Sequence, residues 1–129
     1  MILVDTTVWI DFFGGFSPPH VRRLESAIAV GEDLCICGLI LAETLQGIRD
    51  DREHARTRAR LEALLYLPME RSTFLAAADH YRSLRRRGIT IRKPVDCMIA
   101  AVALEHDALL LHNDRDFDPL EKHFGLRIA

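Results

Sequence analysis

The first six residues, Met1-Ile2-Leu3-Val4-Asp5-Thr6, restrict the fold more than any other stretch of this chain. Ile2 to Val4 is an uninterrupted apolar run, which is typical of a central strand buried on both faces of a parallel sheet. The run stops at a carboxylate, a group that is seldom placed in a core without a partner. Because open α/β sheets bind ligands at the carboxyl ends of their strands, Asp5 is the first candidate site residue.

Apolar runs and helical repeats alternate along the rest of the chain. Further short strands are predicted over residues 34–37, 66–69, 108–111 and 126–128, and helices over 8–13, 17–31, 39–48, 50–65, 72–88, 94–104 and 117–124. This alternation predicts a three-layer α/β/α sandwich, in which right-handed crossovers join a parallel sheet of four to five strands.

Helix caps and buried faces follow from the same pattern. Thr6 or Thr7 is expected to cap the first helix, and Ser72 or Thr73 the helix over 72–88. The apolar positions of that second helix are expected to face inward: Phe74, Ala77, Ala78, Tyr81 and Leu84.

Length and composition favour a single domain over residues 1–129, because 129 residues with 49% hydrophobic content suffice for one core. A net charge of -2 excludes a global basic field for nucleic acid, so a polyanion would have to bind locally. The odd number of cysteines, Cys35, Cys37 and Cys97, indicates reduced core thiols. Without a long apolar stretch or a signal segment, the expected location is the cytoplasm, with no membrane partner.

Four acidic residues occupy unusual places: Asp5 after the first strand, Glu43 within an apolar helix, Asp96 in the first turn of the most apolar helix, and Asp114 after the fourth strand. Strand ends and the helix starts that leave them share one edge of a parallel sheet, so these side chains can converge. Converging carboxylates repel one another unless a cation compensates. Oxygen-only ligands favour Mg²⁺, with Mn²⁺ as the alternative.

Each acid also has a simpler explanation. Asp96 could be a helix N-terminal acid, worth about 0.3–1 kcal/mol against the dipole. Asp114 and Asp116 could be turn residues, with Asp116 capping the last helix. Glu43 is harder to explain this way, because its neighbours are apolar. The joint pattern, rather than any one residue, favours a metal site.

Basic residues lie just before Asp96 and beside Asp114. Arg92, Lys93 and residues 85–87 could contact phosphates, although arginines in a last helical turn also complement the helix dipole. Arg115 is interpreted as a salt-bridge partner or a phosphate contact. Phosphate binding and a purely structural role therefore both stay open for residues 85–87.

Four motifs resemble one family in order and spacing over essentially the whole chain. They are Ile2-Leu3-Val4-Asp5-Thr6-Thr7-Val8-Trp9-Ile10-Asp11, Ala42-Glu43-Thr44-Leu45-Gln46-Gly47, Pro94-Val95-Asp96-Cys97-Met98-Ile99-Ala100-Ala101 and Leu111-His112-Asn113-Asp114-Arg115-Asp116-Phe117. The chain resembles the PIN-domain ribonucleases, and among these the VapC-type toxins of bacterial toxin–antitoxin pairs. One departure is His112, where the family often has Ser or Thr.

The resemblance implies a Mg²⁺-dependent endoribonuclease that hydrolyses phosphodiester bonds of RNA. It implies Asp5, Glu43, Asp96 and Asp114 as catalytic acids, Asp116 as an accessory metal ligand and Thr6 as a polar neighbour toward the substrate. It also implies a VapB-type antitoxin that covers the acidic cleft, with an Arg directed at the carboxylates, and a homodimer. Trp9, Phe12, Phe13 and Phe16 could line an antitoxin groove or pack in the core.

Other functions have distinct sequence requirements. A PIN nuclease of RNA maturation is the nearest alternative, and a small neighbouring reading frame with a DNA-binding N-terminus would distinguish the toxin from it. A receiver domain, a Mg²⁺-binding α/β module outside the toxins, needs adjacent acids after the first strand and a Lys after the fifth, which are not found. A haloacid-type phosphatase needs an Asp at Thr7. Loss of catalysis is disfavoured because all four acids are present.

Overall fold

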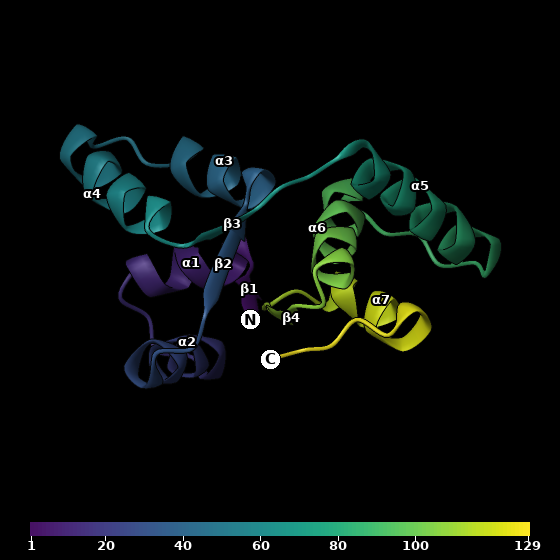
Figure 1. Ribbon diagram of the computed structural model, residues 1–129, viewed down its shortest axis with the longest axis horizontal. Helices are drawn as coiled ribbons and strands as arrows, with labels where there is room; N and C mark the ends of the chain where they lie inside the picture. Colours follow the sequence, from purple (N-terminus) through teal and green to yellow (C-terminus); the bar gives the residue numbers. More distant parts are fainter.

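The computed structural model describes all 129 residues as alternating strands and helices (Figure 1). The elements are β1 (Ile2–Val4), α1 (Thr6–Phe13), α2 (Pro19–Val30), β2 (Leu34–Cys37), α3 (Gly38–Gln46), α4 (Asp51–Glu62), β3 (Leu65–Leu67), α5 (Arg71–Arg86), α6 (Pro94–Glu105), β4 (Leu109–Leu111), the 3₁₀ turn η1 (Arg115–Phe117) and α7 (Asp118–Phe124).

The sheet has four parallel strands in the order β3-β2-β1-β4, so β1 is central as its apolar run predicts. All three residues of β1 are completely buried. The predicted last strand, 126–128, is reduced to a single bridge between Leu110 and Ile128. The segment shares only two backbone hydrogen bonds with β4, from the Leu110 amide to the Arg127 carbonyl at 2.8 Å and from the Ala129 amide to the Leu110 carbonyl at 2.9 Å, so no regular fifth strand forms.

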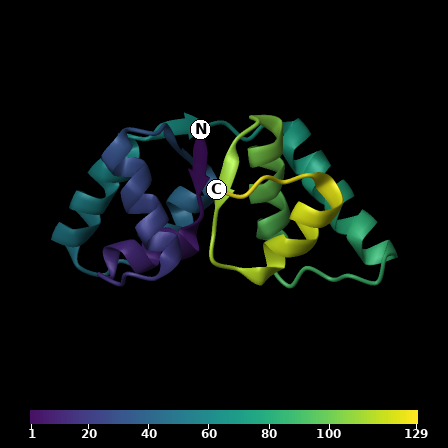
Figure 2. The ribbon, with the colours of Figure 1, turned by 90° about the horizontal axis from the view of Figure 1, so that it is seen from below.

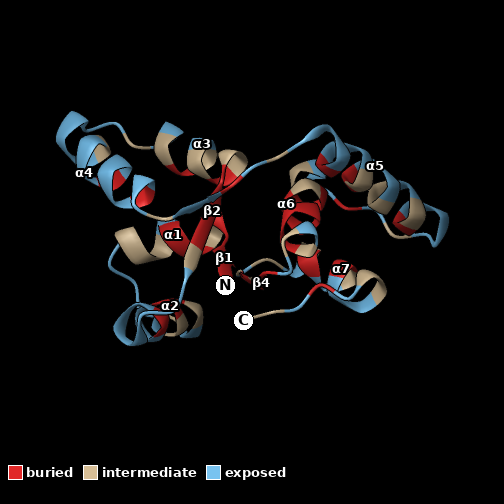
Figure 3. Cartoon of the chain, viewed as in Figure 1, coloured by how far each residue is buried: buried red, intermediate tan, exposed pale blue.

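The helices form two layers, α1 to α4 on one side of the sheet and α5 to α7 on the other (Figures 1 and 2). Burial is concentrated in β1, β2 and β4 and along α6, whereas the edge strand β3 is mostly exposed (Figure 3). The predicted three-layer α/β/α fold is therefore confirmed. Helix α6 is the most buried helix because its apolar side chains occupy every face, as its sequence indicates.

Two predicted helix caps are wrong. Asp5 itself caps α1, since its side chain accepts a hydrogen bond from the Thr7 amide at 3.2 Å. Glu70 precedes α5, and its amide donates to the Thr73 hydroxyl at 3.1 Å in a capping box. In both cases an acidic residue that precedes the expected Thr or Ser caps the helix. The helix therefore starts earlier in the sequence than the Thr or Ser cap predicts.

Several apolar positions are exposed although the helical repeat predicts them inside. Phe74 is 45% exposed and Ala78 is exposed too, whereas Ala77 and Leu84 are buried as expected. The reason is the rotation of α5: its buried line passes through Thr73, Ala77 and Leu84, where α6 packs. The helix expected over 50–65 also ends at Glu62, because Leu65 begins β3 beside Cys35.

The three cysteines are free and buried, as expected from their sequence context. None of the helices combines the length and the apolar character needed to cross a membrane. The single-domain organisation over 1–129 stays a prediction.

His80 provides a pH-dependent contribution to stability. Its ring stacks on Phe124 with the centroids 4.3 Å apart, which joins α5 to α7. Burial lowers the pKa of His80 below 6.5, only partly opposed by Asp79. The unfolded chain therefore binds this proton more readily, and the contribution to stability is complete above pH 6.5 and is lost as the pH falls below it.

We expect His80→Phe, which keeps an aromatic ring against Phe124, to lose less stability than the wild type between pH 7.5 and pH 5. Urea unfolding of both proteins at the two pH values measures this difference. An equal loss in both proteins would contradict the assigned role of His80.

Candidate metal centre

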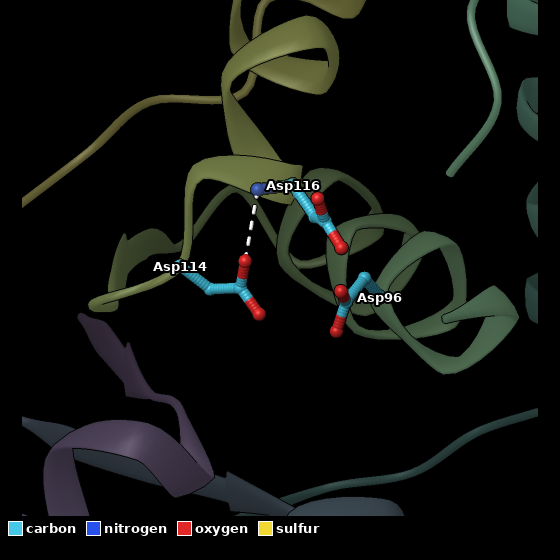
Figure 4. A group of neighbouring side chains, drawn as sticks. All are labelled: Asp96, Asp114 and Asp116. Atoms are coloured by element: carbon cyan, nitrogen blue, oxygen red, sulfur yellow. Dashed lines mark hydrogen bonds between the residues drawn. The ribbon is translucent and has the colours of Figure 1, made fainter. Parts of the chain in front are cut away.

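Three carboxylates meet at the carboxyl edge of the sheet. Asp96 comes from the first turn of α6, Asp114 follows β4, and Asp116 lies in η1. One carboxylate oxygen from each residue lies within 4.8 Å of the other two (Figure 4). Segments about 20 residues apart in sequence thus form one acidic cluster, here called the acidic triad.

Local backbone geometry holds each member of the acidic triad. Pro94 stands in the first turn of α6, where its missing N–H is not needed, so Asp96 falls in the same turn. Asp114 caps η1, because its Oδ1 accepts the amide of Asp116 at 2.9 Å. This short turn brings Asp116 back toward Asp114 and the start of α6.

Asp5 lies beside the acidic triad but is not one of its three members. Its amide donates to the Leu111 carbonyl at 2.9 Å, which extends the β1–β4 pairing by one residue. Its side chain is buried and its Oδ2 accepts a 2.6 Å hydrogen bond from the Thr7 hydroxyl. The negative charge of Asp5 is nonetheless close enough to raise the pKa of Asp96.

Glu43 lies half-buried on α3 and outside the acidic triad. Its Oε1 accepts a hydrogen bond from the Thr6 hydroxyl at 3.1 Å. Thr6 is itself buried, so in this structure its hydroxyl orients Glu43. The catalytic role of Glu43 and the substrate contact of Thr6 stay predictions.

Asp96 carries the strongest electrostatic perturbation of the site. Burial raises its pKa from 3.8 to about 7; Lys93 opposes this shift, whereas Asp114, Asp5 and Asp116 add to it. The Oδ2 atom of Asp96 is buried and has no hydrogen-bond partner. A buried carboxylate oxygen without a hydrogen-bond donor is costly, and the Lys93 ammonium, 3.9 Å away, offsets this cost only in part.

The acidic triad fits a divalent cation. All donors are carboxylate oxygens, which suit hard ions, and the unpaired Asp96 Oδ2 faces a place where a cation would remove the cost of burial. No histidine or cysteine contributes a ligand atom to the group. The donor chemistry therefore supports an oxygen-ligated metal and disfavours a zinc site of the Cys/His type.

Basic side chains surround the acidic triad. The ammonium of Lys93 is 2.5 Å from Asp114 Oδ2 and 3.9 Å from Asp96 Oδ2, and Arg92 reaches Asp116 at 3.4 Å. Burial raises the pKa of Asp114, but the hydrogen bonds from Lys93 and from the Asp116 amide, together with the charges of Lys93 and Arg92, outweigh burial, and the pKa is lowered. Arg115 is exposed and makes no salt bridge, so of its two interpretations the phosphate contact stays a prediction.

Arg92 and Arg115 border a polar pocket next to the acidic triad. Its lining residues are Arg92, His112, Asn113, Asp114, Arg115 and Asp118. Such a pocket, with guanidinium groups beside carboxylates, can receive an anion that is also bound to a metal.

Two residues position the site in ways that the sequence does not predict. The Thr7 hydroxyl accepts the Asn113 amide at 3.1 Å while donating to Asp5, and His112 Nδ1 accepts the Asp114 amide at 3.0 Å. Together they fix the turn after β4 relative to β1. His112 was noticed only as a departure from the family pattern; the position of Thr7 directly after Asp5-Thr6 was the available signal.

Known proteins show the same fold and sequence pattern. The model of the PIN domain family matches residues 2–122. Ribonuclease VapC11 of Mycobacterium tuberculosis is 38% identical over 133 residues, which cover 100% of this chain and 98% of the relative. Ribonuclease VapC1 of Methanocaldococcus jannaschii is 30% identical, over 98% of this chain and 85% of the relative.

The chain belongs to the PIN-domain family of VapC ribonucleases. Among solved structures, VapBC2 from Rickettsia felis bound to a promoter DNA fragment superposes with a TM-score of 0.78 at 18% identity, covering 100% of this chain and 98% of that one. VapBC from Salmonella typhimurium bound to DNA gives 0.75 at 22% identity, with 99% and 96% covered. These structures support the fold. Membership of the PIN family excludes the receiver and haloacid alternatives.

The raised pKa of Asp96 predicts how the metal-free protein responds to pH. Because the folded-state pKa of about 7 exceeds the ordinary 3.8, the folded chain holds this proton more tightly, and stability falls as the pH rises from about 4 to 7. In EDTA at pH 8 we expect Asp96→Asn to be more stable than the wild type by about 1–3 kcal/mol, since the amide carries no buried charge.

Urea unfolding at pH 8 and pH 5 in EDTA measures this effect, and the advantage of Asp96→Asn should shrink at pH 5. Excess Mg²⁺ should stabilise the wild type more than the variant. If Asp96→Asn were less stable than the metal-free wild type at pH 8, the negative charge of Asp96 would be compensated by groups within the protein, and the prediction would be wrong.

Proposed function

We propose that this protein is an endoribonuclease and the toxin of a toxin–antitoxin pair, hydrolysing RNA at a site that uses Mg²⁺. The observation that carries the proposal is the acidic triad, with its unpaired and buried Asp96 Oδ2, at the carboxyl edge of a PIN fold. Relatives named VapC ribonucleases at 38% identity over the whole chain support the RNA substrate. Complexes titled VapBC support an antitoxin partner.

We assign the metal-holding role to Asp96, Asp114 and Asp116. Mg²⁺ is favoured over softer ions because every donor is a carboxylate oxygen, and Mn²⁺ fits the same donors. When bound, a divalent ion would supply Lewis-acid chemistry, activating water and offsetting negative charge on the phosphodiester. Asp5 and Glu43 extend the negative field around the triad, and Thr7 and Thr6 hold their carboxylates.

The substrate phosphates require cations beside these acids. Arg92 is 78% exposed on its side chain, and Arg115 is exposed at the polar pocket, so both can contact a phosphate without losing a buried partner. Lys93 lies at the same edge. Residues 85–87 lie at the C-terminal end of α5, where they also complement the helix dipole, and their contact with RNA stays a prediction.

The antitoxin is proposed to occupy an apolar groove between α1, α2 and the α4–β3 segment. The groove, about 580 Å³ in volume, has Ile28 and Leu65 about half exposed in its wall. The rings of Phe12 and Phe13 also line it, with the Arg60 guanidinium 5.4 Å and 5.2 Å from their centroids. Its remaining lining residues are Trp9, Glu32, Asp33, Leu34, Leu61, Ala63 and Leu64.

The groove is therefore lined by Trp9, Phe12 and Phe13, which also pack within the layer formed by α1 to α4. Phe16 does not line the groove and is 63% exposed. An exposed apolar groove with an arginine and two acids suits an amphipathic segment of a partner protein. The homodimer and the cytoplasmic location stay predictions.

We expect the purified protein, free of partners, to cleave an RNA pool in Mg²⁺ and not in EDTA. Asp96→Asn and Asp114→Asn should each lower the cleavage rate at least 100-fold, because each removes a ligand charge from the acidic triad. Gel analysis of end-labelled RNA gives the rates. Glu62→Gln, which changes an exposed acid on α4, is the matched control and should retain full activity.

Cleavage that persists in EDTA would refute the metal-dependent nuclease. Cleavage by Asp96→Asn and Asp114→Asn at the wild-type rate would refute it too. Far-ultraviolet circular dichroism of each variant shows that the loss of activity is not a loss of fold.

Ile28→Glu is expected to reduce copurification of the cognate antitoxin at least tenfold, because it places a charge in the apolar groove. Val30→Glu is the matched control: Val30 is on the same helix and 70% exposed but does not line the groove. Coexpression with a tag on this protein, followed by quantification of both chains, gives the result. Equal copurification by both variants would place the antitoxin elsewhere.

A further inference from the structure

Lys93 occupies an unusual position for a residue expected to bind substrate. Its ammonium is 2.5 Å from Asp114 Oδ2 and 3.9 Å from Asp96 Oδ2. Asp96 Oδ2 is the same buried oxygen that has no hydrogen-bond partner. The lysine thus lies against two of the three carboxylates of the acidic triad.

We propose that Lys93 is a resident counter-cation of the acidic triad, that a divalent ion displaces its ammonium from Asp114, and that Lys93 thereby sets the affinity of the site for the ion. The proposal rests on the metal-dependent function proposed above. It assigns Lys93 a role in metal binding that precedes any contact with RNA.

Electrostatics explains why such a lysine is present. Without a cation, burial first and then the charges of Asp114, Asp5 and Asp116 disfavour the ionised form of Asp96. One ammonium lowers this repulsion but leaves Asp96 Oδ2 at 3.9 Å, outside hydrogen-bond range. A small ion of charge two, shared among the three carboxylates, compensates them better than this one-sided contact.

The geometry also allows displacement without a change in the backbone. Lys93 is the residue before α6, its backbone is extended ahead of Pro94, and its side chain is 48% exposed. A flexible four-carbon stem can therefore move its ammonium into solvent while Asp96 stays in place. If Lys93 also contacts a phosphate of the substrate, that contact follows ion binding, because only then is the ammonium free.

Arg92 provides the matched control. It is the neighbouring residue, carries the same charge and reaches the third acid, Asp116, at 3.4 Å, but it does not contact Asp114 or Asp96. Loss of either cation strengthens the negative field. Only loss of Lys93 also removes a competitor from the oxygens of Asp114 and Asp96.

The test is calorimetric titration of the full-length protein with Mn²⁺ alone, at pH 8 and without RNA. We expect Lys93→Gln to bind Mn²⁺ about tenfold more tightly than the wild type, and Arg92→Gln less than threefold more tightly. In EDTA, Lys93→Gln should unfold at a lower temperature than the wild type, because the acids then lack their counter-cation. Tighter ion binding combined with lower metal-free stability is the result that the proposal requires.

A measurement on the wild type covers the case in which Lys93→Gln does not fold. The ¹⁵N-labelled ammonium of Lys93, assigned by comparison with Lys122→Arg, should change its chemical shift on saturation with Mg²⁺. An unchanged Lys93 signal in saturating Mg²⁺, or equal effects of Lys93→Gln and Arg92→Gln on Mn²⁺ affinity, would overturn displacement. If the wild type and both variants bind no ion, the metal-dependent function itself fails, and the role of Lys93 with it.

Discussion

The pairing of β1 with β4 is the interaction on which the site depends. The ladder runs from Ile2 opposite Leu109 to Val4 opposite Leu111 and continues through the hydrogen bond from the Asp5 amide to the Leu111 carbonyl. Both strands are short, so their carboxyl ends lie side by side, and the chain leaves the sheet at the same level after β1 and after β4. Asp5 then turns into α1, and the turn beginning at His112 carries Asp114. Apolar burial of β1 therefore determines where the carboxylates lie.

The site combines this rigid support with charges that oppose folding. Asp96 is 3% exposed and lies in the first turn of the most buried helix, where burial raises the pKa of its carboxyl to about 7. The core around α6 supplies the compensating free energy. Charged side chains are seldom buried, and exceptions are characteristic of functional sites. Burial is what distinguishes Asp96 from an ordinary acid in the first turn of a helix.

The sequence predicts the order of elements well because apolar runs of three or four residues, separated by helical repeats, allow few arrangements other than a parallel sheet. It also identifies Asp96, Asp114 and Asp116. It does not predict that Asp5 and Glu43 lie outside the triad, since that depends on side-chain directions set by Thr7 and Thr6. The rotation of α5, which exposes Phe74, is likewise tertiary: the helical repeat admits two apolar lines, and packing of α6 selects one.

His112, the residue at which the chain departs from the family pattern, hydrogen-bonds to the backbone of Asp114. Its Nδ1 accepts the Asp114 amide, so the ring proton is on Nε2, and burial lowers the pKa of His112 and keeps the ring neutral. The ring packs 4.7 Å from the centroid of Phe117, which is completely buried in η1. A neutral acceptor orients the amide of Asp114 without adding a positive charge to the triad. The positive charge next to these carboxylates in the structure is therefore left to Lys93 and Arg92.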